Sequence, residues 1–86
     1  MNGTDERLEA CLASLRAWCK EAKVVPTGDG RVGEEIAAQL IGISPDTLAN
    51  WRAEGKAPEH FRIGGPGYRI SYELRTIAAW IQARRI

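Results

Sequence analysis

The segment from Ala38 to Trp51 places the strongest constraint on what this chain can fold into. Its pattern predicts the end of one helix, a tight turn at Gly42 and the start of a second helix. Ser44 can cap the second helix, because its hydroxyl can accept a backbone N–H of the first turn. Pro45 then falls at the first helical position, where its missing N–H costs nothing. Two short helices joined by a glycine-containing turn form a helix-turn-helix, whose second helix can enter the DNA major groove.

The length of 86 residues allows one domain, spanning residues 1–86, with one modest core. No apolar run approaches the roughly 20 residues of a membrane span. No pattern typical of a signal peptide opens the chain. We therefore expect a cytoplasmic protein without membrane partners. Cys11 and Cys19 are eight residues apart, which is about 12 Å along a helix and too far for a disulfide, so we expect buried thiols.

The distribution of charge is more informative than the net charge of +1. Residues 1–23 are neutral in sum, residues 24–60 carry −3 and residues 61–86 carry +4. A basic C-terminal third of this kind is typical of a chain that meets an anionic partner.

An amphipathic helix is predicted over residues 4–23, ahead of the central segment. It would be capped by Thr4 and followed by a loop over residues 24–32 that contains Pro26 and two glycines. Its apolar stripe has two interpretations: it packs on the core of its own domain, or it pairs with a second chain in a homodimer. The stripe comprises Leu8, Cys11, Leu12, Leu15, Trp18, Cys19 and Ala22; in the dimer the contacts would come from Leu8, Leu12, Leu15 and Trp18.

Two further helices make up the central pair, Gly33–Ile41 and Ser44–Glu54. In the second, Leu48 and Trp51 would point inward, while Asp46, Thr47, Asn50 and Ala53 would point outward. Gly55 is a natural stop for this helix.

A short β-hairpin is predicted after the helix pair, because Phe61–Ile63 and 68–70 each place an arginine between two apolar residues. The joining segment 64–67 is Gly-Gly-Pro-Gly. Alternation puts the apolar side chains on one face, which must lie on the helices, and Arg62 with Arg69 on the other. Ser71 would then cap a last helix over 72–84.

The order helix, turn, helix, hairpin, helix resembles the compact winged helix-turn-helix domains of phage excisionases, AlpA-type prophage regulators and the MerR DNA-binding head. The resemblance covers about residues 34–85, which places the winged helix-turn-helix at 33–86, and the N-terminal helix is an addition to that fold. It depends on the segment 38–44, on Thr47-Leu48, Trp51-Arg52, 54–58, Arg62-Ile63-Gly64, Tyr68-Arg69 and Ala79-Trp80-Ile81.

The resemblance implies a mainly α, sequence-directed DNA-binding protein of the excisionase or transcription-regulator type, with double-stranded DNA as partner and a protein partner such as an integrase. Helix 45–54 would lie in the major groove, and the hairpin 61–70 would act as a wing on the backbone or minor groove. Asn50 can bond an adenine edge, Thr47 a thymine methyl or a phosphate, and Asp46 the N4 amine of cytosine. The candidates for phosphate contact are Arg52, Lys56, Arg62, Arg69 and Arg75.

No catalytic, metal or cofactor site is expected. His60 is the only histidine, and with two separated cysteines it makes no zinc signature. Ser44 has no histidine–carboxylate pair to activate it, and the glycine-rich tip lacks the Lys-Ser/Thr of a P-loop. The alternative function is a protein-interaction module, such as a phage assembly factor or anti-repressor, because the second helix of the pair is acidic rather than basic.

Overall fold

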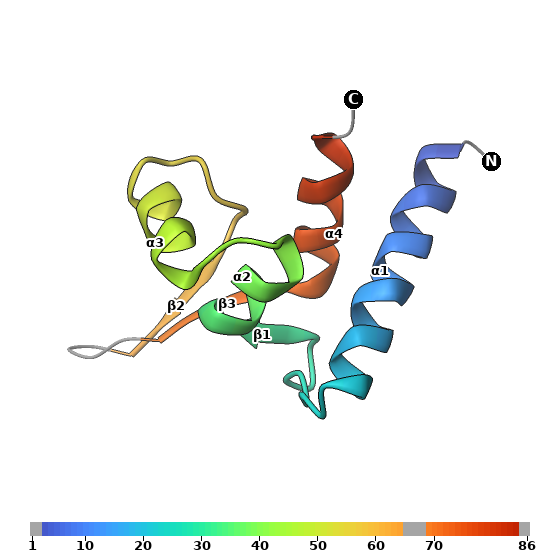
Figure 1. Ribbon diagram of the computed structural model, residues 1–86, viewed down its shortest axis with the longest axis horizontal. Coiled ribbons are helices and arrows are strands. Elements are labelled where there is room, and N and C mark those ends of the chain that lie inside the picture. Colours follow the sequence, from blue (N-terminus) through green and yellow to red (C-terminus); the bar gives the residue numbers. More distant parts are fainter. Residues whose placement is uncertain (1–2, 65–68, 85–86) are drawn as a thin grey trace.

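The computed structural model describes residues 3–64 and 69–84, which form four helices and a three-stranded antiparallel sheet (Figure 1). The described helices include none that is long and apolar enough to cross a bilayer. The elements in chain order are α1 (Gly3–Glu21), β1 (Arg31–Gly33), α2 (Glu34–Ile41), α3 (Pro45–Ala53), β2 (Phe61–Ile63), β3 (Arg69–Glu73) and α4 (Leu74–Ala83).

The helix α1 packs along α4 at the end of the molecule away from α3 (Figure 1). It begins at Gly3, so that Thr4, expected as its N-cap, lies inside its first turn. Leu12, Leu15 and Cys19 are buried in the core of the same chain. The first interpretation of the apolar stripe is therefore realised, and Leu12 and Leu15 are not available to a second chain. Trp18, assigned to the same stripe, is 37% exposed.

The predicted turn between α2 and α3 is confirmed. Gly42 has φ of 94° and donates its N–H to Ala38 O, so it ends α2 in the left-handed conformation that glycine adopts at no steric cost. Ser44 caps α3, since its Oγ accepts the N–H of Thr47 at 3.1 Å, and Pro45 is the first helical residue. Leu48 is fully buried and fixes the inner face of α3 on the core.

The sheet contains one strand that the sequence analysis missed. Residues 31–33 were expected to end a loop and begin a helix, but they form β1, which pairs with β3. Three residues show too little alternation to be distinguished from a loop. The strand order is β1-β3-β2, so that β3 is central and pairs on both sides at Ser71, with Gly33 and with Phe61.

The last helix begins later than predicted. Tyr72 lies in β3, fully buried, and α4 starts at Leu74 with Glu73 as its N-cap residue. Ser71 is therefore a strand residue, not a helix cap. The N–H of Leu74 donates to Gly30 O at 2.8 Å, which joins the start of α4 to the loop before β1.

The strand β2 faces the opposite way from the prediction, whereas Ile70 of β3 packs on the core as predicted. Phe61 and Ile63 are 44% and 53% exposed, so they do not lie on the helices. The core face of the sheet carries Val32 and Tyr72 instead, with Ile70 packed beside them. The tip, residues 65–68 including Tyr68, lies outside the described residues.

Candidate nucleic-acid interface

The outer face of α3 is exposed along its length. Asp46, Asn50 and Ala53 are spaced one helical turn apart and all face solvent. Among the described residues, neither Asp46 nor Asn50 has a side-chain hydrogen-bond partner. Thr47 is half-buried, and its Oγ1 lies 2.8 Å from Ser44 Oγ, so its hydroxyl belongs to the cap.

The C-terminal end of α3 is held by a polar cluster, which we call the Glu34 cluster: Glu34, Arg52 and Tyr72. Glu34 Oε2 accepts from Arg52 Nε at 2.7 Å and from the Tyr72 hydroxyl at 2.7 Å, and its Oε1 accepts from Arg52 Nη2 at 3.1 Å. The side chains of Arg52 and Glu34 are 17% and 20% exposed. The cluster thus ties α3 to the start of α2 and to the central strand.

The electrostatics of the Glu34 cluster follow from this geometry. Hydrogen bonds from Arg52 lower the pKa of Glu34 against the opposing effect of burial, and the Tyr72 hydroxyl lowers it further. Burial and the adjacent Glu34 carboxylate raise the pKa of Tyr72 far above its usual range. The cluster is therefore a carboxylate–guanidinium pair with a neutral phenol at neutral pH.

A second contact fixes α3 against α4. The rings of Trp51 and Trp80 lie with centroids 5.9 Å apart at an interplanar angle of 35°. Both side chains are half-buried, as expected for residues at the edge of the core. The guanidinium of Arg84 lies 3.7 Å from the centroid of Trp80, a cation–π arrangement.

Three of the predicted phosphate ligands are engaged within the chain. Arg52 is part of the Glu34 cluster. Arg75 bonds Glu9 of α1 at 2.8 Å, and α1 lies at the end of the molecule away from α3 (Figure 1). Lys56 follows α3 and pairs with Glu54 at 3.2 Å, but both side chains are more than half exposed, so this pair is easily exchanged for another partner.

The hairpin arginines lie on opposite faces of the sheet, contrary to the prediction. Arg62 pairs with Ile70 in the register, and Arg69 pairs with Ile63. Directly opposed residues of antiparallel strands project to the same face. Arg62 therefore shares the face of the sheet that packs on the helices, and Arg69 shares the outer face with Phe61 and Ile63. Both arginines are exposed.

Glu34 and Tyr72 were not predicted from the sequence as members of the site, and both lie far from Arg52 along the chain. In the sequence, Glu34 cannot be distinguished from an ordinary acidic residue in the first turn of a helix. Its partners are 18 and 38 residues away, and no local pattern indicates such pairings.

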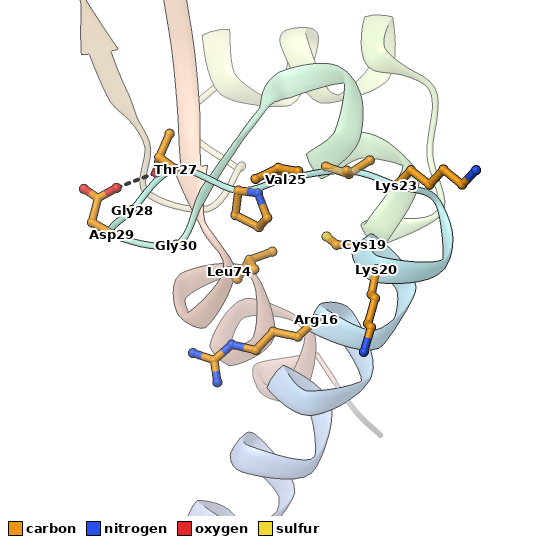
Figure 2. Close-up of a pocket in the computed structure, with 12 residues that line it drawn as sticks. Arg16, Cys19, Lys20, Lys23, Val25, Thr27, Gly28, Asp29, Gly30 and Leu74 are labelled. Atoms are coloured by element: carbon orange, nitrogen blue, oxygen red, sulfur yellow. Dashed lines mark hydrogen bonds between the residues drawn. The ribbon is translucent and has the colours of Figure 1, made fainter.

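A groove of about 730 Å³ lies between the C-terminal half of α1 and the loop before β1 (Figure 2). Leu74 and Cys19 form its floor, and Arg16 lies across it beneath Leu74 (Figure 2). Lys20 and Lys23 point away from it, so the three cations do not converge (Figure 2). Burial raises the pKa of the Cys19 thiol, which makes it a poor nucleophile. The groove carries no arrangement that could do chemistry.

Comparison of the chain with protein-family models, with curated protein sequences and with solved structures gave no match. The described residues form a small, mostly helical chain with a three-stranded antiparallel sheet, in which the outer face of α3 is exposed.

Proposed function

We propose that the chain is a small winged helix-turn-helix protein that binds double-stranded DNA, of the excisionase or prophage-regulator type. One observation carries the proposal: α3 is fixed at both ends, while Asp46 and Asn50 on its outer face have no side-chain partner among the described residues. Ser44 caps its start and the Glu34 cluster holds its end. A helix held in this way can present side chains to a groove with little loss of conformational entropy on binding.

In this proposal Asn50 and Asp46 read base edges and the methyl group of Thr47 meets a thymine. Lys56 and Arg62 contact phosphates, because Lys56 follows α3 and Arg62 lies on the helix-facing side of the hairpin, which serves as the wing. Arg52 takes no part, since it is held in the Glu34 cluster, and Arg75 takes no part, since it lies on α4 against Glu9 of α1, away from α3. Two phosphate contacts per copy predict a salt slope of about −2 in log K against log [salt].

The test starts with selection of bound duplexes from a random pool, followed by fluorescence anisotropy on the selected duplex. Asn50→Ala should weaken binding by roughly 5- to 150-fold and relax the preference at one base pair. Arg62→Ala should weaken all duplexes alike and reduce the salt slope by about 1.

Arg75→Ala is the matched control, because it removes the same charge from α4 on the side away from α3. It should leave affinity and slope unchanged. A slope near zero, or equal losses in Arg62→Ala and Arg75→Ala, would refute the assignment of α3 and the hairpin as the DNA-binding face.

The second candidate is a protein-interaction module with the same shape. Its support is the acidity around α3, where Asp46, Glu54 and Glu59 are all exposed and would repel phosphate. Absence of duplex binding at low salt, together with a stable complex with a protein partner, would favour this function over the first.

A further inference from the structure

A cluster of exposed apolar side chains lies on the outer face of the sheet. In the part of the chain that the structure describes, the large exposed apolar residues are Trp18, Val25, Phe61 and Ile63. Single exposed apolar residues are common, but a contiguous group usually marks an interaction site. Val25 is 91% exposed and lines the same cavity as Ile63. We name the group Val25, Arg31, Phe61, Ile63 and Arg69 the sheet patch.

The sheet patch includes a groove of about 400 Å³ at the point where β1 ends. Val25, Ile36 and Ile63 supply apolar lining, while Arg31 and Arg69 lie at the same groove. The chain turns into α2 after Gly33, whereas β3 continues beyond its partner Ser71 to Ile70 and Arg69. No described strand pairs with these two residues on the β1 side.

The unpaired edge of β3 at Arg69 and Ile70 favours a ligand with an extended backbone. Successive residues of a strand direct their N–H and C=O groups to alternate sides. One of Arg69 and Ile70 therefore offers its backbone groups to a chain lying in the groove. An added segment would gain main-chain hydrogen bonds there and place a side chain among Val25, Ile36 and Ile63.

The charges of the sheet patch select an acidic ligand. The Arg31 guanidinium is already occupied, because it bonds Asp29 and Ser71 and lies 5.2 Å from the centroid of the Phe61 ring. Arg69 is exposed and has no ion-pair partner among the described residues. The patch thus combines an apolar groove with one cation that is free to pair.

We propose that the sheet patch docks a short extended segment of a partner protein, in which one or two large apolar side chains lie next to an aspartate or glutamate. A second copy of this chain is a poorer occupant, because a two-fold contact through the same patch would bring two Arg69 side chains into one interface, and the patch has no acidic residue to pair with them. The proposal is independent of DNA binding, which we assign to α3 and to the opposite face of the hairpin.

The test is a displayed library of random peptides, selected on the wild-type protein and then measured as synthetic peptides by fluorescence anisotropy. Enriched peptides should carry Leu, Ile, Val or Phe next to an acidic residue. Ile63→Ser should lower their affinity by about tenfold or more. Arg69→Glu should abolish binding, and exchange of the peptide's acidic residue for lysine should restore binding to this variant.

Two matched controls separate the sheet patch from general effects. Trp18→Gln removes another exposed apolar side chain, this one from α1, and Arg62→Glu reverses a charge on the other face of the same hairpin. Both should bind the selected peptides as the wild type does, even if Arg62→Glu loses duplex binding. All four variants change exposed residues, so their thermal unfolding should match that of the wild type.

Three outcomes would overturn the proposal. The first is a library that shows no enrichment over background. The second is a set of enriched peptides that bind the wild type and Ile63→Ser equally. The third is a dimer in sedimentation velocity that Ile63→Ser dissociates, which would assign the patch to a second copy instead.

Discussion

Removal of the carboxylate of Glu34 tests how α3 is held in place. In Glu34→Ala the buried Tyr72 hydroxyl loses its acceptor, which costs about 1–3 kcal/mol. Arg52 loses two charge-assisted hydrogen bonds at a site where its side chain is 17% exposed. This loss adds about 1–2 kcal/mol to the destabilisation. We expect the free energy of unfolding to fall by about 3 kcal/mol. A chain of 86 residues has a total free energy of unfolding of about 4–13 kcal/mol. The expected loss is therefore a large fraction of the stability of the protein.

The assay is urea unfolding followed by tryptophan emission, with Glu35→Gln as the control. Glu35 is the exposed neighbour of Glu34, and its substitution should change the unfolding free energy by less than about 0.5 kcal/mol. Tyr72→Phe removes the hydroxyl itself and leaves no donor unpaired, so it should cost only about 1 kcal/mol. A double-mutant cycle with Glu34→Gln then gives the coupling between the two groups.

The pH dependence gives an independent signature. The pKa of Glu34 in the folded chain is lowered from its ordinary value of 4.5. Its stabilising contribution is therefore complete above that value and is lost as the pH falls through the lower, folded pKa. The difference between wild type and Glu34→Gln should be constant from about pH 6 to 8 and shrink below about pH 4.5. A loss under about 0.5 kcal/mol in Glu34→Ala, or a difference that does not vary with pH, would refute the reasoning.

Three further substitutions are expected to act through local structure, and each is measured by the same unfolding assay. Ser44→Ala removes the acceptor of the Thr47 N–H and should cost about 1 kcal/mol; an unchanged midpoint would mean that the cap is replaced by water. Lys23 has φ of 60°, so Lys23→Gly should stabilise the chain by about 0.5–1 kcal/mol, whereas Lys23→Ala should not. Arg75→Ala breaks a pair whose side chains are 54% and 58% exposed and should cost less than about 0.5 kcal/mol; a larger loss would show that the pair anchors α1.

The local parts of the fold could be predicted from the sequence because their causes are local. Ser44 and Pro45 mark the start of α3 through capping and a preset φ, and Gly42 marks the turn through the left-handed conformation. The stripe of α1 repeats over four turns, long enough for its period to be unambiguous. These features need only residues within one or two turns of each other.

The facing of the hairpin could not be predicted, because the alternation of Phe61–Ile63 fixes which residues share a face but not which face is buried. That choice depends on the register with β3, where Tyr72 supplies the buried ring. The same limit explains the late start of α4 at Leu74. Residues 71–73 continue a strand only because β1, some 40 residues earlier, pairs with them.

The candidate site was predicted in part. The outward positions of Asp46 and Asn50 follow from helical periodicity and are confirmed. The engagement of Arg52 with Glu34, and of Arg75 with Glu9, depends on contacts between distant segments. An arginine that binds a carboxylate within the chain looks the same in a sequence as one that is free to bind a phosphate.

The contact between Trp51 and Trp80 provides a spectroscopic signal for the orientation of α3 relative to α4. One indole belongs to α3 and the other to α4, with centroids 5.9 Å apart, so their electronic transitions are coupled and give near-ultraviolet circular dichroism that depends on the angle between the rings. A ligand that reorients α3 against α4 changes this signal without any label. A ligand that docks on the outer face of the sheet leaves this circular dichroism signal unchanged. The signal therefore distinguishes binding at α3 from binding at the sheet patch.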